Sequence, residues 1–288
     1  MQSLTSPQTI RALMSKHGVR FSKGLGQNFI INPGICPKIA EAGGAGHGVG
    51  ALEIGPGIGV LTQELARRCD RVVCVEIDSA LIPVLQETMA EYPNVHIVHA
   101  DVLKTDLHEL VRSRLAGLDV IVCANLPYYI TSPILMYLLE SRLPVRSVTV
   151  MVQKEAAQRI CAPLPSRAAG AITAAVHYYS EPKLLFPVSK GSFLPAPKVD
   201  SAVIRLDIRE TPPVEVAQEE LFFKVIKGAF SQRRKTLLNC LSTYFSTDKA
   251  SMAAILAQAD VAPASRAEAL SLQEFAAVSN ALASLESR

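Results

Sequence analysis

The sequence lacks long hydrophobic runs. No segment approaches the ~18 uninterrupted apolar residues that a transmembrane helix needs, and the opening stretch MQSLTSPQTIRALMSKHG has no apolar core of the kind found in signal peptides. We therefore expect a cytoplasmic protein that does not bind a membrane. Internal repeats and low-complexity segments are also absent from the sequence, which excludes a repeat architecture.

Paired cysteines and closely spaced metal ligands are lacking as well. None of the six cysteines belongs to a CxxC pair, and Cys74 and Cys123 lie inside apolar runs, which is typical of reduced packing residues. His96 and His99 are three residues apart in a predicted strand, so their rings point to opposite faces. The sequence therefore predicts neither a disulfide framework nor a zinc site.

Neither charge nor polarity is extreme. Hydrophobic residues make up 49% of the chain and charged residues 19%, which is typical of a globular enzyme and excludes a disordered chain. The formal net charge of +3 permits a nucleic-acid partner without requiring one. With 288 residues, the chain can form one large and one small domain, or two of moderate size.

Short apolar runs alternate with helix-like stretches in the first half of the chain. Fully apolar strands separated by helices predict a parallel sheet covered on both faces, the doubly wound, Rossmann-like α/β class. A further strand is expected at 147–153, and an antiparallel pair at the sheet edge from 183–188 and 201–208. The four alternating runs are GALEI, RVVCVEI, VHIVHA and DVIVCA, which end near residues 54, 77, 100 and 124.

The composition changes after Arg209. The segment ETPPVE predicts a linker, and residues 214–288 show helical periodicity without strand candidates. Ser271, followed three residues later by Glu274, is typical of a capping box. We therefore predict an α/β domain over 1–211 and a small α-helical domain over 212–288.

A glycine-rich loop, EIGPGIG, follows the first predicted strand. Gly55, Gly57 and Gly59 let the backbone turn sharply and approach a ligand, in front of a helix expected to begin at Val60 or Leu61. By itself, such a loop is equally compatible with a turn that binds nothing. A second feature is needed to indicate a ligand.

Glu76 supplies that feature at the end of the second strand. It lies 21 residues after Gly55 (76 − 55), the offset at which a carboxylate binds ribose hydroxyls in nucleotide-binding folds. Asp78 is a competing candidate that is better placed to cap the next helix. A dinucleotide fingerprint would require a third glycine at position 60, which is Val60, so the spacing favours S-adenosyl-L-methionine over a dinucleotide.

The four strands each end in a polar or glycine residue. Asp101 follows the third strand. It could accept a hydrogen bond from an adenine amino group, or it could cap a helix that begins in the following segment, VLKTDL. Asn125 ends the fourth strand. Because open α/β sheets bind ligands at the carboxyl ends of their strands, we expect Gly55, Glu76, Asp101 and Asn125 to form one site.

The Asn-Leu-Pro-Tyr sequence after the fourth strand suits methylation of a nucleobase amine. Such an amine is a poor nucleophile because its lone pair is delocalised into the ring. The Asn125 amide oxygen and the Leu126 carbonyl can hold its two N–H groups and direct the lone pair at a methyl donor. Pro127 has no backbone N–H and stiffens the turn. These residues are therefore the predicted catalytic group, together with Tyr128.

Aromatic residues near this turn can hold the base. We expect Tyr128, rather than Tyr129, to stack on an extruded base, because it directly follows the proline. Phe193 is a candidate second aromatic wall, and a core role is equally compatible with its sequence context. Ser132 and Pro133 are expected to be the N-cap and the first residue of the next helix.

Taken together, these motifs resemble those of the S-adenosylmethionine-dependent small-subunit (16S) ribosomal RNA adenine dimethyltransferases. The resemblance covers nearly the whole chain, and its combination of motifs is more specific than any one of them. The chain carries a departure at Ala169-Gly170, where family members usually have Tyr-Gly. The motifs are KGLGQNFIIN, EIGPGIGVLT, VEID, NLPYYITSP, VQKEAAQRI, FLPAPKVDSAV, AFSQRRKTL and SRAEALS.

The resemblance implies a cofactor and a set of residues that bind it. In that family the GQNF segment folds over the methyl donor, which assigns Asn28 and Ile30 to the cofactor site. Without the resemblance, Gln27 and Asn28 would be interpreted as a turn. The implied set for S-adenosyl-L-methionine is Asn28, Ile30, Gly55, Gly57, Glu76, Asp101 and Asn125.

The resemblance also implies contacts with RNA phosphates. Charge alone would favour a solvated helix face for the RRK segment, and the family likeness shifts the prediction to RNA contact. Arg233 and Arg234 are the best candidates because guanidinium groups bind phosphates through two hydrogen bonds. The full candidate set is Lys23, Lys198, Arg233, Arg234 and Lys235.

The implied activity is the methylation of N6 of two adjacent adenosines in small-subunit ribosomal RNA, giving N6,N6-dimethyladenosine. The expected partner is the RNA of a partly assembled small subunit, bound by a monomer of this chain. Three alternatives stay open at this stage: a large-subunit methyltransferase of the antibiotic-resistance type, a non-catalytic assembly or transcription factor, and a dehydrogenase. The intact NLPY and glycine motifs favour retained chemistry, and the glycine spacing disfavours the dehydrogenase.

Overall fold

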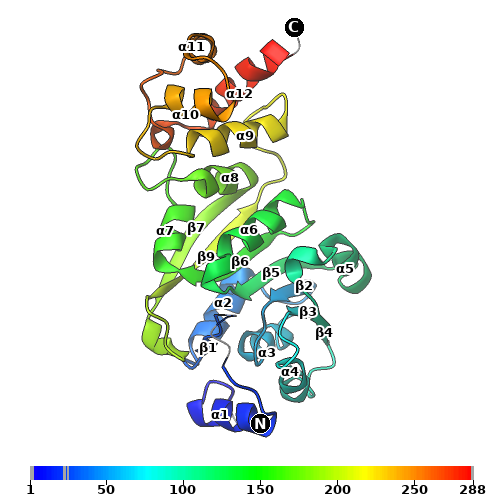
Figure 1. The fold of residues 1–288 in the computed structure, drawn as a ribbon. Coiled ribbons are helices and arrows are strands. Elements are labelled where there is room, and N and C mark those ends of the chain that lie inside the picture. The colour runs from blue at the N-terminus through cyan, green and yellow to red at the C-terminus, as the bar shows by residue number, and fades with distance from the viewer. Residues whose placement is uncertain (1–2, 22–23, 25, 287–288) are drawn as a thin grey trace. The chain divides into compact units, whose positions relative to one another are not determined.

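The computed structural model describes residues 3–21, 24 and 26–286 (Figure 1). The α-helices among these residues are α1 Pro7–Lys16, α2 Ile35–Gly43, α3 Val60–Ala66, α4 Ile82–Thr88, α5 Leu107–Arg114, α6 Thr131–Glu140, α7 Lys154–Ile160, α8 Ala171–Tyr179, α9 Glu219–Ala229, α10 Leu237–Tyr244, α11 Lys249–Gln258 and α12 Leu272–Glu286. The strands are β1 Phe29–Ile30, β2 Val49–Ile54, β3 Arg71–Glu76, β4 Val95–His99, β5 Asp119–Asn125, β6 Ser147–Gln153, β7 Ser180–Val188, β8 Phe193–Leu194 and β9 Ser201–Ile208. Four short 3₁₀ turns in the described part are η1 Val102–Lys104, η2 Tyr128–Ile130, η3 Lys190–Ser192 and η4 Ala267–Ala269.

The larger of the two sheets has seven strands in the order β4-β3-β2-β5-β6-β9-β7. The strands from β4 to β6 are parallel, and β9 runs antiparallel to β6. The predicted doubly wound α/β fold is therefore confirmed, with β9 and β7 added at one edge as expected. A second sheet pairs β1 with β8 in antiparallel fashion.

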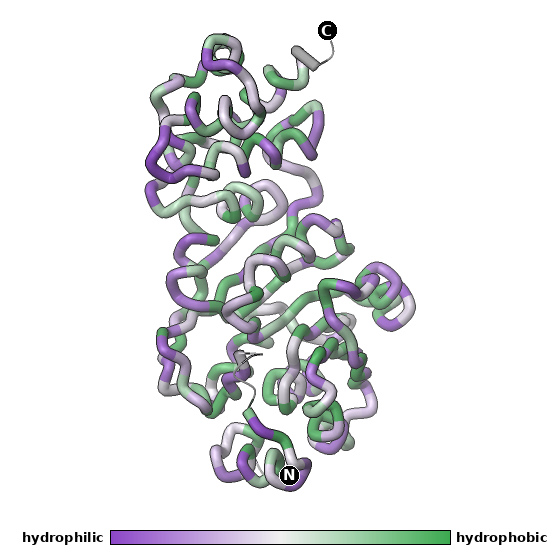
Figure 2. Tube along the Cα trace, viewed as in Figure 1, coloured by the Kyte–Doolittle hydropathy of each residue, from purple (hydrophilic) through white to green (hydrophobic). Residues whose placement is uncertain are grey.

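The apolar runs form strands because both faces of the sheet are covered. All residues of β2 are buried, and in β5 and β6 only the end residues are not. In Figure 1, α6 lies in front of β5 and β6, and α2 lies behind them. Figure 2 shows hydrophobic residues along these strands and many hydrophilic residues in the outer turns. This two-sided burial is the physical reason for the continuous apolar runs in the sequence.

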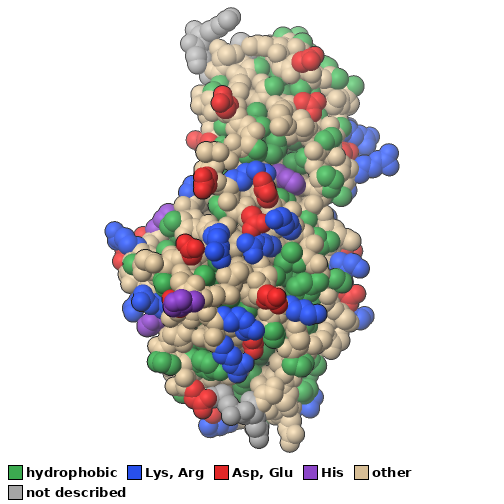
Figure 3. Space-filling view, turned by 180° about the vertical axis from the view of Figure 1, so that it is seen from behind, with side chains coloured by type: hydrophobic (Ala, Val, Ile, Leu, Met, Phe, Trp, Pro, Cys, Tyr) green, Lys and Arg blue, Asp and Glu red, His purple; other side chains and the backbone are tan. Residues whose placement is uncertain are grey.

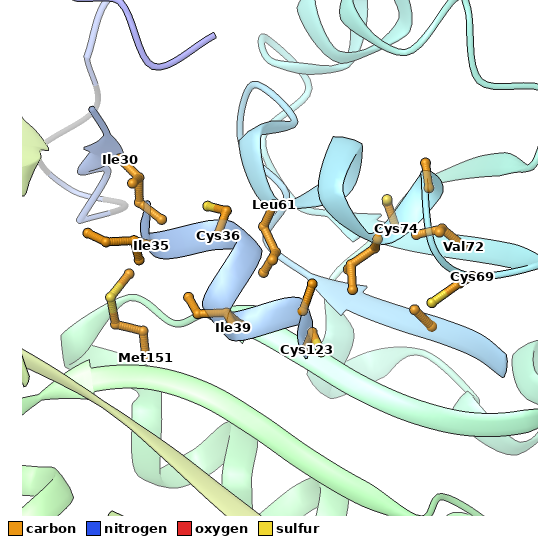
Figure 4. Close-up of a cluster of buried hydrophobic side chains, with 14 of the residues drawn as sticks. Ile30, Ile35, Cys36, Ile39, Leu61, Cys69, Val72, Cys74, Cys123 and Met151 are labelled. Atoms are coloured by element: carbon orange, nitrogen blue, oxygen red, sulfur yellow. The ribbon is translucent and has the colours of Figure 1, made fainter. Parts of the chain in front are cut away.

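Helix α2 packs on the sheet through a cluster of buried side chains. Figure 4 shows Ile39 of α2 between Met151 of β6 and Cys123 of β5, and Cys36 of α2 beside Leu61 of α3. All six cysteines are free, and only Cys161 is less than fully buried. They act as small hydrophobic packing residues, as the sequence predicts.

The chain forms two compact units. The first comprises the residues up to Ala157 together with Lys183–Ile208, and the second comprises Gln158–Pro182 and the residues from Arg209 onward. The last of these joins, between Ile208 and Arg209, lies near the boundary at residue 211, which stays a prediction. The second unit also takes in 158–182, including α8, which the sequence analysis assigned to the first domain.

An aromatic cluster joins α8 to α9 inside the second unit. Tyr178 contacts Phe222 at a ring-centroid distance of 5.0 Å, and Tyr179 stacks on Phe223 at 5.3 Å. Both tyrosine hydroxyls donate to the Glu219 carboxylate, at 3.1 and 3.0 Å. Pairing between segments about 40 residues apart explains why α8 belongs to this unit although strands follow it in the chain.

Local signals placed several helix ends correctly. Ser271 and Glu274 form the predicted capping box, in which Ser271 N–H donates to the Glu274 carboxylate at 2.7 Å and Glu274 N–H donates to Ser271 Oγ at 3.2 Å.

Residues 214–286 contain no strand. In the part of the chain that the structure describes, no helix combines the length and the apolar character that a bilayer crossing demands.

The start of α6 differs from the prediction. The helix begins at Thr131, with Ile130 in the cap position, so Ser132 is not the N-cap and Pro133 is not the first helical residue. The reason is the 3₁₀ turn η2, which runs directly into α6. Thr131 Oγ1 donates to the Pro127 carbonyl at 3.2 Å and fastens the two turns together.

The strand β2 carries a buried carboxyl group that the sequence analysis did not single out. Glu53 is only 1% exposed, and the Cys74 thiol of the neighbouring strand donates to its Oε2 at 3.6 Å. Burial raises the pKa of Glu53 to about 8, because a carboxylate is poorly stabilised away from water. The Glu53 carboxyl is therefore largely protonated at neutral pH.

This burial predicts an unusual pH dependence of stability. The folded state binds the Glu53 proton more tightly than the unfolded chain, so its contribution to stability is lost as the pH rises from the usual 4.5 toward about 8. We expect Glu53→Gln, which stays neutral, to weaken this loss. Urea unfolding between about pH 5 and about pH 9 measures it, with the exposed Glu155→Gln as a control. Parallel profiles for the wild type and Glu53→Gln would contradict the expectation.

Candidate active site

A pocket opens at the carboxyl ends of the parallel strands in the first unit. The parallel register sets Ile54 of β2 beside Val75 of β3 and Ala124 of β5, so the residues that follow these strands meet at one edge. The pocket is lined by all the predicted cofactor-binding and catalytic residues: Asn28, Ile30, Gly55, Gly57, Glu76, Asp101, Asn125, Leu126, Pro127 and Tyr128.

The glycine loop depends on backbone conformations that residues with a side chain rarely adopt. Gly55, Gly57 and Gly59 have φ angles of +67°, +61° and +91°. A Cβ atom at Gly57 would lie 3.2 Å from the Phe29 ring. A residue with a side chain would therefore be crowded at this position, in addition to having an unfavourable backbone conformation. At Gly55 a Cβ would meet no atom within 4 Å, which leaves open space where a ligand can approach the backbone.

Glu76 is built into this loop. It is 5% exposed, and its carboxylate accepts from Gly57 N–H at 3.1 Å and from Asp78 N–H at 2.9 Å. Burial raises the pKa of Glu76, while these two N–H donors oppose the rise. Each carboxylate oxygen has a second lone pair, so Glu76 can still accept from the hydroxyls of a ligand.

Asp78 does not have the predicted role of a helix cap. Its Oδ2 accepts from Gln27 Nε2 at 2.6 Å, and its Oδ1 accepts from Ala80 N–H at 3.0 Å. It does not cap α4, whose cap residue is Leu81 and has no side-chain hydrogen bond. Asp78 instead fastens the GQNF segment to the turn after β3.

Asp101 both caps a turn and lines the pocket. Strand β4 ends at His99, so Asp101 lies two residues beyond the strand. Its Oδ1 accepts from Leu103 N–H at 3.0 Å, which is the capping role considered from the sequence, although the element is the 3₁₀ turn η1. The other oxygen, Oδ2, lies 3.6 Å from Lys104 Nζ.

Asn125 is oriented by the GQNF segment. Its Nδ2 donates to the Asn28 carbonyl at 3.4 Å, and Asn28 Nδ2 donates to the Gly26 carbonyl at 2.9 Å. Within the described residues, no hydrogen bond reaches Asn125 Oδ1. The amide oxygen is therefore available as an acceptor in the pocket.

The next three residues present a backbone carbonyl and a ring. Leu126 N–H donates to the Met151 carbonyl at 3.1 Å, which fixes the peptide, while no donor among the described residues reaches the Leu126 carbonyl. The Tyr128 side chain is half-buried, and its hydroxyl lies 2.6 Å from Ser201 Oγ. Burial raises the pKa of the Tyr128 phenol, so the ring stays neutral at physiological pH.

The other aromatic candidate lies in the core. Phe193 is 3% exposed, pairs with Ile30 across the β1–β8 ladder and does not line the pocket. Of the two roles considered for Phe193, the structure favours the core role over the aromatic wall.

The basic candidates lie outside the pocket. Arg233, Arg234 and Lys235 are exposed in the turn between α9 and α10 of the second unit, so they do not form the helix face considered for them. Lys198 is exposed in the loop before β9, and Lys23 lies outside the described residues. Figure 3 shows Lys and Arg side chains interspersed with acidic ones on one face of the molecule, without a continuous basic stripe.

The sequence analysis missed the apolar lining of the pocket. Ile77 and Val102 line it, directly after Glu76 and Asp101, and Ile77 is 51% exposed. An apolar residue that follows an acid at a strand end was the available signal. Acceptors for hydroxyl and amino groups beside apolar side chains and an open glycine backbone suit a nucleoside, so these residues fit S-adenosyl-L-methionine.

Comparison with known proteins agrees with this geometry. The model of the family "Ribosomal RNA adenine dimethylase" matches residues 18–284. Proteins named ribosomal RNA small subunit methyltransferase A are 46% identical in Alkaliphilus oremlandii (strain OhILAs) over 98% of this chain and 99% of theirs, and 45% identical in Geobacillus sp. (strain WCH70) over 98% of each chain.

Solved structures show the same similarity. A dimethyladenosine transferase from Plasmodium falciparum has a TM-score of 0.72 and 26% identity, and the match covers 87% of this chain and 95% of that one. The 23S rRNA methyltransferase ErmE has a TM-score of 0.67 and 26% identity, covering 89% of this chain and 100% of that one.

Proposed function

This chain belongs to the ribosomal RNA adenine dimethylase family, and from that premise we propose that it methylates N6 of two adjacent adenosines in small-subunit (16S) ribosomal RNA. The product is N6,N6-dimethyladenosine. The observation that carries the proposal is that one pocket is lined by the glycine loop, by Glu76 and by Asn125 and Leu126, whose two acceptors have no donor among the described residues. The small-subunit relatives match at about 46% identity, compared with 26% for the large-subunit enzyme, which disfavours the large-subunit alternative.

The pocket residues divide naturally between the parts of S-adenosyl-L-methionine. Glu76 would hold the ribose hydroxyls, Asp101 the adenine amino group, and Ile77 an apolar face of the adenine. Gly55 lets the backbone approach the ligand closely. When bound, the cofactor supplies an electrophilic methyl group on a sulfonium sulfur.

Asn125 and Leu126 would orient the attacking amine. Asn125 Oδ1 and the Leu126 carbonyl each accept one N–H of the adenine amino group, which directs the nitrogen lone pair at the methyl carbon. The new N–C bond would form to the methyl group that the cofactor supplies, as the bond from that methyl to sulfur breaks, and the displaced amine proton would pass to water. After the first transfer, one N–H is left for one of the two acceptors, so the same geometry can serve a second transfer.

Tyr128 would hold the extruded base by stacking. Its ring lines the pocket, and the contact between its hydroxyl and Ser201 Oγ at 2.6 Å fixes the ring before substrate arrives. A preorganised ring lowers the entropy that binding must remove. Retention of this machinery also argues against a purely non-catalytic assembly factor.

The setting of the reaction is a further part of the proposal. We propose that the substrate RNA is bound within a partly assembled small subunit, and that the protein acts as a cytoplasmic monomer. Support for the monomer comes from the pocket, whose lining residues all come from one unit of one chain. Support for RNA contact comes from the exposed Arg233-Arg234-Lys235 turn, which has no ion pair with an acidic side chain among the described residues.

The first prediction tests the cofactor site. Glu76→Gln should weaken S-adenosyl-L-methionine binding about 10- to 100-fold, because hydrogen bonds to a charged acceptor contribute about 1.5–3 kcal/mol. Isothermal titration calorimetry measures the affinity, and circular dichroism checks the fold. Glu91→Gln, an exposed carboxyl in the same unit, serves as the control. Unchanged affinity in Glu76→Gln would remove Glu76 from the cofactor site.

The second prediction concerns the product and Tyr128. Immature small subunits incubated with the protein and S-adenosyl-L-methionine should accumulate N6,N6-dimethyladenosine, detected by mass after digestion to nucleosides. Tyr128→Ala should lower turnover about 5- to 100-fold with little change in cofactor affinity, because the ring positions the base. Tyr128→Phe should keep most of the activity. Monomethyladenosine alone at long times would refute dimethylation.

The third prediction concerns the basic turn. Changing Arg233, Arg234 and Lys235 together to alanine should weaken RNA binding and reduce the slope of log affinity against log salt by about 0.7–0.9 for each RNA phosphate that these side chains neutralise. Cofactor affinity should not change. The charge-matched control changes the exposed Arg11, Arg112 and Arg114 to alanine. Equal salt-dependence slopes for the two triple variants would show that this turn is an ordinary solvated surface that does not contact RNA.

A further inference from the structure

Tyr129 is an exposed aromatic residue at the rim of the pocket. Its side chain is 61% exposed, although it lines the same pocket as the half-buried Tyr128. Isolated exposed apolar residues are ordinary on protein surfaces. Tyr129 differs from such residues because its ring lines the pocket beside the proposed base site.

One edge of the ring lies beside Gly26. A Cβ atom built on Gly26 would lie 3.5 Å from Tyr129 Cδ1 and 3.6 Å from Cε1, so a side chain at position 26 would meet the ring. Gly26 has a φ of +63°, a conformation that further favours glycine there. No hydrogen bond within the described residues fixes the Tyr129 hydroxyl. One edge of the ring thus faces Gly26, and most of the side chain is exposed to solvent.

The local geometry separates the two tyrosines. Both belong to the 3₁₀ turn η2, in which successive side chains are about 120° apart around the axis. Tyr128 is anchored to Ser201, while one edge of the Tyr129 ring lies beside Gly26. One turn therefore presents one ring inside the pocket and a second ring at its rim.

We propose that Tyr129 is a stacking platform for the base next to the target adenine. This inference rests on the proposed function, in which two adjacent adenosines are modified. Extruding one base breaks its stacking with its neighbours, and an exposed aromatic ring can restore that stacking for the base that stays outside. The ligand of this subsite is a nucleobase of the same RNA strand, with a purine bound better than a pyrimidine because of its larger ring surface.

Three substitutions separate stacking from packing. Tyr129→Phe keeps the ring, Tyr129→Leu keeps apolar bulk against Gly26 without a ring, and Tyr129→Ala removes both. We expect the Tyr129→Leu and Tyr129→Ala variants to have a kcat/KM on immature small subunits that is about 5- to 100-fold lower than that of the wild type. The Tyr129→Phe variant should change kcat/KM by no more than about twofold. The dissociation constant of S-adenosyl-L-methionine should stay within about twofold for all three. Leu184→Ala, at a 50% exposed position on β7, is the control.

A change in the RNA provides the second arm. In subunits whose neighbouring adenosine is replaced by uridine, the loss caused by Tyr129→Leu should shrink, because the wild type itself then stacks on a smaller ring. Cofactor binding that weakens together with kcat/KM would overturn the proposal and make Tyr129 a support for the Gly26 segment. Full activity of Tyr129→Leu beside an active wild type would overturn this inference alone. A wild type that leaves both adenosines unmodified would overturn the proposed function, and this inference with it.

Discussion

The hydrogen bond from Gly57 N–H to the Glu76 carboxylate holds the pocket together. It joins the loop after β2 to the end of β3, and it forms because these strands are parallel neighbours whose carboxyl ends lie at one edge. The bond also requires a left-handed backbone at Gly57, where the Phe29 ring leaves little space for a side chain. Because Glu76 is buried, the two groups depend on each other. The loop supplies the N–H donor that the buried carboxylate needs, and the carboxylate holds the loop in the conformation that lines the pocket.

The parts of the fold that follow from local patterns could be predicted from the sequence. Fully buried strands need continuous apolar runs, so β2, β3 and β5 were identifiable, and Glu76 followed from its offset to Gly55. Features that depend on distant partners were not identifiable. The Asp78–Gln27 bond joins residues 51 positions apart, and the assignment of α8 to the second unit depends on contacts with α9. Neither leaves a local signal.

One wrong prediction and one choice between two roles have a shared physical origin. The predicted cap at Ser132 and the candidate aromatic wall at Phe193 were both inferred from residue type in a short window. In the structure, η2 extends α6 toward its N-terminus, and the pairing of β8 with β1 buries Phe193 against Ile30. Residue type thus gave plausible local roles, and tertiary pairing decided between them. Glu53 is the opposite case, in which burial changes the protonation of a residue that local pattern gave no reason to notice.

The geometry also links the cofactor side of the pocket to its substrate side. Asn125 Nδ2 donates to the Asn28 carbonyl, and this bond turns the amide so that no donor among the described residues reaches Oδ1. Asn28 in turn belongs to the segment that Gln27 ties to Asp78, two residues after Glu76. The acceptor that we propose for the amine is therefore oriented by the same segment that would lie over the methyl donor. Because both proposed tasks depend on one short stretch of backbone, we expect a base to be aligned for attack only when this segment is in its place beside the cofactor.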